Sequence, residues 1–292
     1  MLKKRVITSL WGIPLISIAA WLDKPLPGFW FTILIAIWGV LAALEFYRVV
    51  AASKVPPLTY FGLVLTLLFI LSRNSELLAI LKPHFDIYLL TPLLLTSLVV
   101  LPLIWLLLQR QKEGVVAGWV WTVAGILYIG WLLGHLVALR GLVDIRYPYV
   151  GRNLVFLTLF ATFASDTAAF FTGRALGRHK LAPDVSPGKT WEGAIAGGIG
   201  AILMSLFFTL PTFFTLTNPF RLPISWWQAI VLGLLVSVFG QLGDLAESLF
   251  KRNMGVKDSG NLLPGHGGLL DRVDSIVFAG VVVYYYAVWL IR

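Results

Sequence analysis

The chain has 292 residues, of which 58% are hydrophobic and only 13% are charged, and its formal net charge is +9. This composition excludes an ordinary soluble domain and predicts a polytopic membrane protein. Because cysteine is absent, disulfides, thiolate metal sites and a cysteine nucleophile are excluded as well. The basic residues are scattered over short loops, which argues against nucleic acid as a partner and fits attraction to anionic membrane lipids.

Apolar stretches long enough to cross a membrane recur along the chain. Crossing a hydrocarbon layer of about 30 Å as a helix takes about 20 mostly apolar residues, so an all-α fold is expected. About nine stretches fit this pattern, and they run from Val6 to Leu22, Gly28 to Leu44, Leu58 to Leu71, Ile87 to Leu108, Val115 to Leu139, Leu154 to Thr172, Gly193 to Phe208, Trp226 to Leu242 and Ser275 to Leu290. The third and the last are short, which leaves eight or ten crossings, or a re-entrant helix, open.

The first apolar stretch follows Lys3, Lys4 and Arg5 and is similar to a secretory signal, but a retained helix is favoured because eight further stretches follow. If all nine cross, the loops on the N-terminal side hold more Lys and Arg than those on the other side, which predicts a cytoplasmic N-terminus. Residues 173–192 and 243–274 would then both lie in the cytoplasm.

The acidic residues divide the chain into two predicted regions. Residues 1–150 are expected to be a scaffold of transmembrane helices, because their acids are few and isolated, at Asp23, Glu45, Glu76, Asp86, Glu113 and Asp144. Residues 151–292 are expected to be the catalytic region, with motif loops in the cytoplasm. Within it, Asp166 interrupts the sixth apolar stretch between Ser165 and Thr167. A carboxylate deep in lipid costs about 2.5 to 3.5 kcal/mol, so Asp166 faces either a polar cavity or a partner such as Arg174.

The loop His179–Gly193 combines helix-breaking prolines with Ser186, Lys189 and Thr190. A turn with these residues, leading into a helix that starts near Thr190 to Glu192, can hold a phosphate on backbone N–H groups and an ammonium. The glycine spacing is not that of a Walker loop. An ordinary basic loop is the alternative.

The eighth apolar stretch ends with Asp244, Glu247, Ser248 and Lys251, at intervals of three, one and three residues. On a helix these four side chains share one face. Two carboxylates, a hydroxyl and a cation on one face suit a hard divalent ion and its anion. The alternative is a solvated helical turn with ion pairs of its own.

Five glycines follow between residues 253 and 270, with His266 among them, and then Asp271, Arg272 and Asp274. Glycines let the backbone come close to a ligand and present its N–H groups. A glycine-rich loop bordered by cations, with Asp244 and Asp271 for two metals, predicts a nucleoside triphosphate site and in-line phosphoryl or nucleotidyl transfer at a membrane surface.

The run SLFKRNMGVKDSGNLLPGHGGLLDRVD, Ser248 to Asp274, resembles the signature of the phosphatidate cytidylyltransferases, or CDP-diacylglycerol synthases. The segments SDT at 165–167 and SPGKTWEG at 186–193 are similar to the same family, although Phe170 stands where the family often has Tyr. Residues 1–150 resemble the family only in being hydrophobic.

This resemblance implies an integral membrane nucleotidyltransferase of phospholipid biosynthesis. Its partners would be CTP, phosphatidic acid and membrane lipids, and its products CDP-diacylglycerol and pyrophosphate. The lipid phosphate would attack the α-phosphorus of CTP with the assistance of Mg²⁺, in a two-metal site whose second metal is open. The expected location is the inner membrane, with several crossings and the active site on the cytoplasmic side, and a homodimer stays open.

The candidate site residues follow from the residue chemistry together with this resemblance. The catalytic candidates are Asp244, Asp271, Lys251 and Arg272. The metal candidates are Asp244 and Asp271 first, with Glu247, Asp274 and Asp166 ligating or orienting. The substrate-binding candidates are Ser186, Lys189, Ser248, Lys251, Arg252, Lys257, Asp258, His266, Gly267, Gly268 and Arg272.

Two other classes of protein remain as alternatives. In a transporter or channel, Asp166 and Asp244 would be intramembrane ion sites, but such proteins commonly show paired halves and here the polar residues gather in one half. A different lipid-phosphate enzyme, such as a lipid kinase, would also use acids, cations and Mg²⁺. The glycine pairs Gly130 with Gly134 and Gly193 with Gly197 predict close helix packing, which we expect within one chain.

Overall fold

The computed structural model describes residues 2–83, 86–108, 114–213, 216–260 and 267–291. The chain forms two compact units, each made of two stretches of sequence. Unit 1 comprises Met1–Gly141 and Asn253–Arg272, and unit 2 comprises Leu142–Arg252 and Val273–Arg292. The described residues 253–260 and 267–272 thus pack with the N-terminal helices. The functional division near residue 150 stays a prediction.

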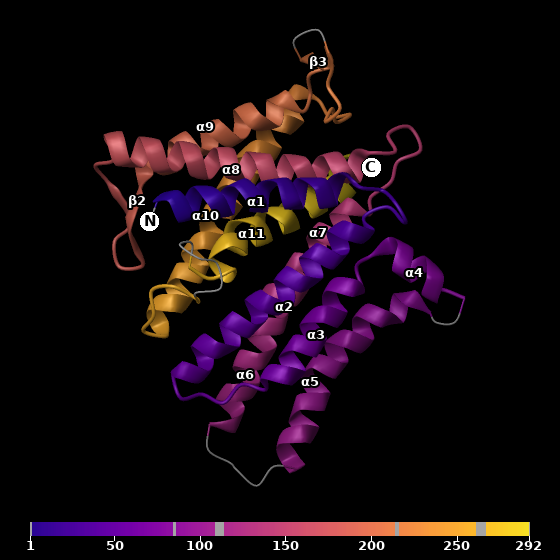
Figure 1. Cartoon of the computed structure of the whole chain (residues 1–292), viewed down its shortest axis with the longest axis vertical. Coiled ribbons are helices and arrows are strands. Elements are labelled where there is room, and N and C mark those ends of the chain that lie inside the picture. The colour runs from indigo at the N-terminus through magenta and orange to yellow at the C-terminus, as the bar shows by residue number, and fades with distance from the viewer. Residues whose placement is uncertain (1, 84–85, 109–113, 214–215, 261–266, 292) are drawn as a thin grey trace. The chain divides into compact units, whose positions relative to one another are not determined.

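Unit 1 is built almost entirely from helices, which short loops connect (Figure 1). Their bounds are α1 Leu2–Trp21, α2 Phe29–Ala52, α3 Thr59–Leu71, α4 Ser75–Leu81, the 3₁₀ turn η1 Ile87–Leu89, α5 Leu90–Leu108, α6 Val115–Gly125, the π-helix η2 Ile126–Trp131 and α7 Leu132–Arg140. The stretch from Val115 to Arg140 is one continuous helical span with a π-turn inside it. Such turns accommodate one extra residue without ending a helix.

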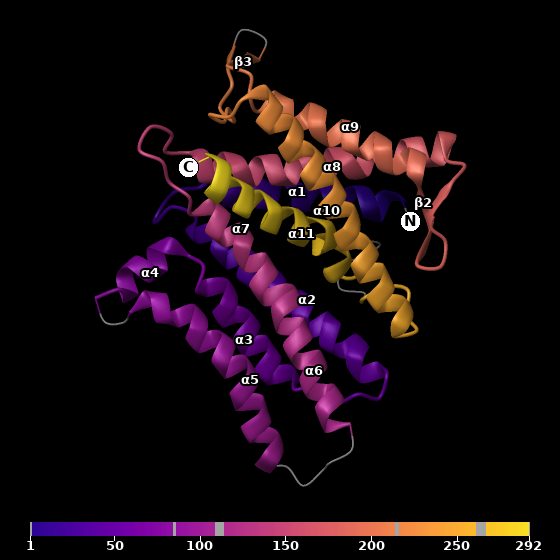
Figure 2. The ribbon, with the colours of Figure 1, turned by 180° about the vertical axis from the view of Figure 1, so that it is seen from behind.

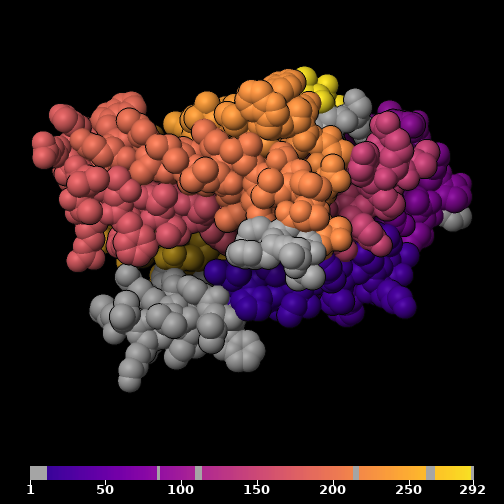
Figure 3. Space-filling view, turned by 90° about the horizontal axis from the view of Figure 1, so that it is seen from above, coloured from indigo at the N-terminus to yellow at the C-terminus, as the bar shows by residue number. Residues whose placement is uncertain are grey.

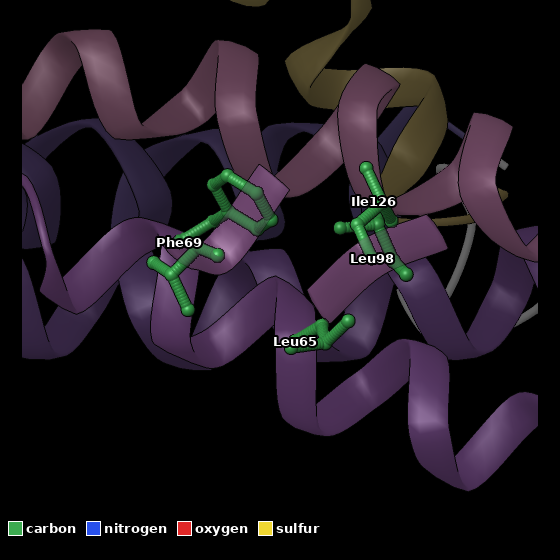
Figure 4. Packing of buried hydrophobic residues seen from close by; sticks show 5 residues of the cluster. Leu65, Phe69, Leu98 and Ile126 are labelled. Atoms are coloured by element: carbon green, nitrogen blue, oxygen red, sulfur yellow. The ribbon is translucent and has the colours of Figure 1, made fainter. Parts of the chain in front are cut away.

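Helix α3 is the centre of unit 1, where it packs against α2, α5, α6, η2 and α7. A core cluster of Leu65, Phe69, Leu94, Leu98 and Ile126 joins α3, α5 and η2 (Figure 4). Close approach is possible because of glycines on the neighbouring helices: a Cβ at Gly130 would come within 2.9 Å of the Thr66 backbone. The prediction that Gly130 serves packing within one chain is therefore confirmed.

Unit 2 contains four long helices and two short hairpins (Figure 2). Their bounds are α8 Val150–Leu176, β1 Lys180–Ala182, β2 Ser186–Thr190, α9 Trp191–Phe207, β3 Thr212–Phe213, β4 Leu216–Thr217, α10 Trp226–Asn253, α11 Leu270–Tyr286 and the π-helix η3 Ala287–Ile291. Helices α8 and α9 lie side by side along their lengths, and the rose and orange atoms of this unit form one continuous surface in Figure 3.

The two hairpins are absent from the sequence-based prediction. Strands β1 and β2 pair antiparallel between α8 and α9, with an irregular register between Lys180 and Ala182. Pro183 and Pro187 prevent a helix here, as predicted, and the extended backbone on either side pairs with itself. The prediction of a turn that leads into a helix is therefore confirmed for this loop, whereas the pairing of its two strands is not predicted from the sequence.

Each of the nine predicted stretches contains a helix, but their lengths differ. Six helical stretches of the described residues are long and apolar enough to cross a membrane, which confirms an all-α polytopic membrane protein. A seventh crossing arises if α3 and α4 form one span, and they are bent by 91°. The seventh predicted stretch appears as a shorter apolar helix, Trp191–Phe207, and the first corresponds to α1, whose part Gly12–Trp21 is apolar. The count of nine crossings stays a prediction.

Substitutions of neighbouring glycines test the packing of α8 on α9. A Cβ at Gly193 would lie 2.7 Å from the backbone oxygen of Ala169, whereas one at Gly198 meets only Leu234 Cδ1 at 4.0 Å. We expect Gly193→Ala to lower the free energy of unfolding by about 1 to 3 kcal/mol through overpacking. The control Gly198→Ala leaves stability unchanged or raises it, because alanine favours helix. Thermal unfolding of both variants in detergent measures this, and equal stability would contradict the packing.

Candidate functional site

Glycine on α10 brings α10 and α11 close enough for their acidic residues to meet. A Cβ at Gly243 would clash with the backbone oxygen of Asp274 and would lie 3.2 Å from the ring of Phe278. Without a side chain at this position, the first turns of α11 lie directly against the polar end of α10. This contact places Asp274 beside Asp244 and Glu247, the acids that follow Gly243 on α10.

Three carboxylates gather at this contact. Oxygens of Asp244 and Glu247 on α10 and of Asp274 on α11 all lie within 4.8 Å of one another. Glu247 is 1% exposed and Asp274 is 7% exposed, while Asp244 is half-buried. Like charges this close, and removed from water, repel strongly unless cations offset them.

Two lysines supply part of that positive charge. Lys251 Nζ lies 2.5 Å from Glu247 Oε2, one helical turn along α10. Lys189 Nζ, from strand β2, lies 2.8 Å from Asp244 Oδ2 and also donates a hydrogen bond to the backbone oxygen of Gln241 at 3.3 Å. The side chains of Lys251 and Glu247 are 13% and 0% exposed, so their ion pair is shielded from solvent, whereas those of Lys189 and Asp244 are 21% and 36% exposed and their pair is partly open to solvent.

The predicted face of α10 is confirmed by these contacts. Ser248 Oγ donates a hydrogen bond to Asp244 Oδ1 at 3.4 Å, so Asp244, Glu247, Ser248 and Lys251 act as one group. Asp166 on α8 is exposed and interacts electrostatically with Asp244 and Lys189. Four acids and two lysines therefore lie together here.

The hairpin β1–β2 and the end of α10 meet, as expected if both motif loops lie on one side of the membrane. Besides the Lys189–Asp244 pair, Arg252 Nε donates a hydrogen bond to the backbone oxygen of Val185 at 3.3 Å. Thr190 begins α9 as its N-cap: its Oγ1 accepts a hydrogen bond from Gly193 N at 3.2 Å. This confirms the predicted helix start and fixes the residue that follows Lys189. Ser186 is half-buried at the start of β2.

A contact between His179 and Glu192 closes the base of this hairpin. His179 Nδ1 lies 2.6 Å from Glu192 Oε1, and His179 N donates to the same carboxylate. Hydrogen bonds from the Glu192 backbone and then from the His179 side chain lower the pKa of Glu192 from 4.5 to about 2. Glu192 is thus ionised at neutral pH and holds the first turn of α9 against the start of β1.

Buried hydroxyls and an amide connect the SDT motif to α10. Ser165 Oγ on α8 shares a hydrogen bond of 2.8 Å with Ser237 Oγ, which accepts another from Gln241 Nε2 at 2.8 Å. Gln241 Nε2 also donates to Ala194 O on α9 at 3.2 Å. These links between α8, α9 and α10 were missed, although polar residues within apolar stretches were a visible signal.

The remaining predicted residues that the structure describes belong to unit 1, where hydrogen bonds hold Asp271. Asp271 Oδ2 accepts hydrogen bonds from Gly268 N at 2.8 Å and Ser259 N at 3.2 Å. Gly267 has a positive φ of 83°, which side chains rarely adopt. Three exposed residues complete the set, namely Lys257, Asp258 and Arg272. His266 lies outside the described residues.

Sequence reasoning assigned Glu45 to the scaffold, but the structure gives it a place beside the residues that hold Asp271. Glu45 is buried on α2 and its Oε2 accepts a hydrogen bond from Leu270 N at 2.9 Å. The signal that could have found it is a lone acid at the end of an apolar stretch, since such residues are retained in membranes for specific partners.

Comparison with known proteins identifies the family. A model of the Cytidylyltransferase family matches residues 3–290. The chain belongs to this family. A phosphatidate cytidylyltransferase of Bacillus subtilis is 36% identical over 256 residues, which are 87% of this chain and 87% of that protein. One of Synechocystis is 33% identical over an alignment covering 100% of this chain and 98% of that protein.

A phosphatidate cytidylyltransferase of Brucella suis is 44% identical over 164 residues, and this chain spans 56% of that relative's length. The resemblance expected from Ser248–Asp274 is thus confirmed. As a member of the cytidylyltransferase family, the chain carries its three-carboxylate group partly within the signature segment and partly just before it.

Removing one lysine tests how far the buried acids of this cytidylyltransferase depend on their cations. We expect Lys251→Met to lower the free energy of unfolding by about 3 kcal/mol, because it leaves the carboxylate of Glu247 without this cation in a shielded site. Combining it with Glu247→Gln recovers most of the loss. Thermal unfolding in detergent measures both, with Lys180→Met on exposed β1 as the control. A single variant as stable as its control would contradict the assignment.

Proposed function

We propose that the chain transfers the cytidylyl group of CTP to phosphatidic acid, forming CDP-diacylglycerol and pyrophosphate. The observation that carries this proposal is the group of Asp244, Glu247 and Asp274 with Lys189 and Lys251, in a chain that belongs to the cytidylyltransferase family. A group that combines carboxylates with lysine ammonium groups suits a reaction between two anions whose charge must be neutralised.

The three carboxylates fit a divalent metal. They offer oxygen ligands from two helices within 4.8 Å, which is the ligand type that Mg²⁺ prefers. When bound, Mg²⁺ would neutralise phosphate charge in the transition state. Asp244, Glu247 and Asp274 would hold it, with Asp166 orienting from α8. Glu247 and Asp274 are therefore proposed as metal ligands on equal terms with Asp244. A metal role for Asp271, which belongs to unit 1, stays a separate proposal.

The cations of the motif would bind the substrate phosphates. Lys189 and Lys251 already lie beside the carboxylates, and each can turn its ammonium to a phosphate oxygen because lysine carries a flexible four-carbon stem. Ser248 can donate a hydrogen bond to the same anion. The further candidates for binding CTP or the lipid headgroup are Ser186, Arg252, Lys257, Asp258, His266, Gly267, Gly268 and Arg272.

The chemical step joins two phosphates. An oxygen of the phosphatidate monoester forms a bond to the α-phosphorus of CTP, the bond from that phosphorus to the bridging oxygen of the β-phosphate breaks, and pyrophosphate leaves with the electron pair. A phosphate monoester is largely dianionic near neutral pH. It is therefore its own nucleophile, and no general base is required. Lysines in a shielded site offset the repulsion between the two anions more strongly than they would in water.

We also propose the membrane arrangement that this reaction needs. The N-terminus and the loops 173–192 and 243–274 would face the cytoplasm across an inner membrane crossed nine times, in accord with the distribution of Lys and Arg. CTP would arrive from water while the acyl chains stay in lipid. The contacts of Lys189 with Asp244 and of Arg252 with Val185 support this arrangement, because they bring the first loop together with the start of the second at one end of unit 2.

Purified protein in liposomes that contain phosphatidic acid tests this function. With CTP and Mg²⁺ we expect equimolar CDP-lipid and pyrophosphate, and Asp244→Asn should lower kcat by about 100-fold or more, because one carboxylate of the charged group is lost. The control is Asp86→Asn at the exposed N-cap of η1. Measurement of both products by mass spectrometry and a phosphate assay gives the rates.

Ion transport across the liposomes without CDP-lipid would favour the transporter alternative and refute the proposal. Activity of Asp244→Asn equal to that of Asp86→Asn would remove the three-carboxylate group from the reaction while leaving the family unchanged.

A further inference from the structure

The residue that carries this inference is Glu45, an acid of the N-terminal helices. It lies on α2, within a stretch apolar enough to cross a membrane, and it is 3% exposed. A carboxylate in such surroundings is unfavourable unless specific donors meet it. Its partners therefore indicate what it is for.

Both partners belong to the signature segment. Glu45 Oε2 accepts a hydrogen bond from Leu270 N at 2.9 Å and from Ser259 Oγ at 3.3 Å. Ser259 and Leu270 stand at the two ends of the glycine-rich part of that segment, 11 positions apart along the chain. One side chain from α2 thus ties both ends of the glycine-rich part to the same point.

Two glycines of the segment are required by this carboxylate. A Cβ at Gly260 would lie 2.7 Å from Glu45 Oε1, and a Cβ at Gly268 would lie 2.6 Å from Glu45 Oε2. Any larger residue at either position would push the segment away from Glu45. The glycines here serve the approach of the backbone to a protein carboxylate, in addition to any approach to substrate.

The backbone held by Glu45 also orients Asp271. Asp271 follows Leu270 directly, and its Oδ2 accepts hydrogen bonds from Ser259 N and Gly268 N. Ser259 therefore contacts Glu45 through its hydroxyl and Asp271 through its backbone N–H. If Glu45 is removed, the donors that orient Asp271 lose their fixed position.

We propose that Glu45 is a positioning residue of the cytidylyltransferase, which acts by holding Ser259 and Leu270 so that Asp271 is presented to the reaction. This inference rests on the proposed function, because Asp271 contributes to turnover only if that reaction takes place. Glu45 itself touches no substrate. It makes α2 part of the catalytic apparatus, although most of that helix is apolar.

The test compares Glu45→Ala and Glu45→Gln with Glu76→Gln, an acid in the first turn of α4. Hydrogen–deuterium exchange of the full-length protein follows the amides of Ser259, Gly268 and Leu270, and steady-state kinetics give kcat and KM for CTP. We expect at least about tenfold faster exchange in Glu45→Ala, because a hydrogen bond to a charged acceptor is lost. A fall in kcat of about tenfold or more should accompany it, with KM changed by less than about threefold.

Glu45→Gln tests whether the acceptor or only the shape matters. Its amide oxygen can still accept a hydrogen bond from Leu270 N, so we expect its exchange rate and its kcat to lie between those of the wild type and Glu45→Ala. Ser259→Ala should lower kcat less than Glu45→Ala does, and adding it to Glu45→Ala should have little further effect, because the two act through one contact. A role in folding alone would lower the yield and the melting temperature but leave the kcat of the folded protein unchanged.

Exchange at Leu270 that is unchanged in Glu45→Ala would overturn the inference, as would unchanged kcat in the folded variant. Wild-type protein that forms no CDP-lipid would instead refute the proposed function. In that case the exchange measurement still decides whether Glu45 holds the segment.

Discussion

The structure depends on the compensation of carboxylates that lie among apolar helices. Burying a charge this way is unfavourable unless donors or cations approach it closely. In unit 2, Lys189 and Lys251 meet the acids of α10, and Gly243 lets Asp274 join them from α11. The pairing of α10 with α11 and with the β1–β2 hairpin follows from this need as much as from apolar packing.

Unit 1 meets the same constraint with different donors. Glu45 is held by a backbone N–H and a hydroxyl, and Arg140 at the end of α7 pairs with Asp23 and donates to the backbone oxygen of Ala20. In each case one side chain joins segments far apart in sequence through two polar contacts. Apolar contacts of the kind seen around Phe69 add stability, and these polar contacts fix the register of the helices because a hydrogen bond requires a specific partner and geometry.

Much of the site could be predicted because the evidence is local. The face of Asp244, Glu247, Ser248 and Lys251 follows from helical spacing, and the start of α9 follows from Thr190 after helix-breaking prolines. Contacts between distant segments could not be predicted in this way. The partner of Glu45 lies more than 200 residues away, and the choice of Asp274 for the three-carboxylate group depends on how closely Gly243 lets α11 approach. The crossings were hardest to count where α3 bends into α4 and where α9 is short.

Binding of Mn²⁺ to the purified protein, followed by electron paramagnetic resonance without CTP or lipid, tests the central claim most directly. If Asp244, Glu247 and Asp274 hold a divalent ion together, Glu247→Gln and Asp274→Asn should each weaken Mn²⁺ binding by about tenfold or more, since each removes one charged ligand. Asp144→Asn, in the loop before α8, should bind as the wild type does. Equal binding by all four proteins would contradict the claim that these three carboxylates form the metal site.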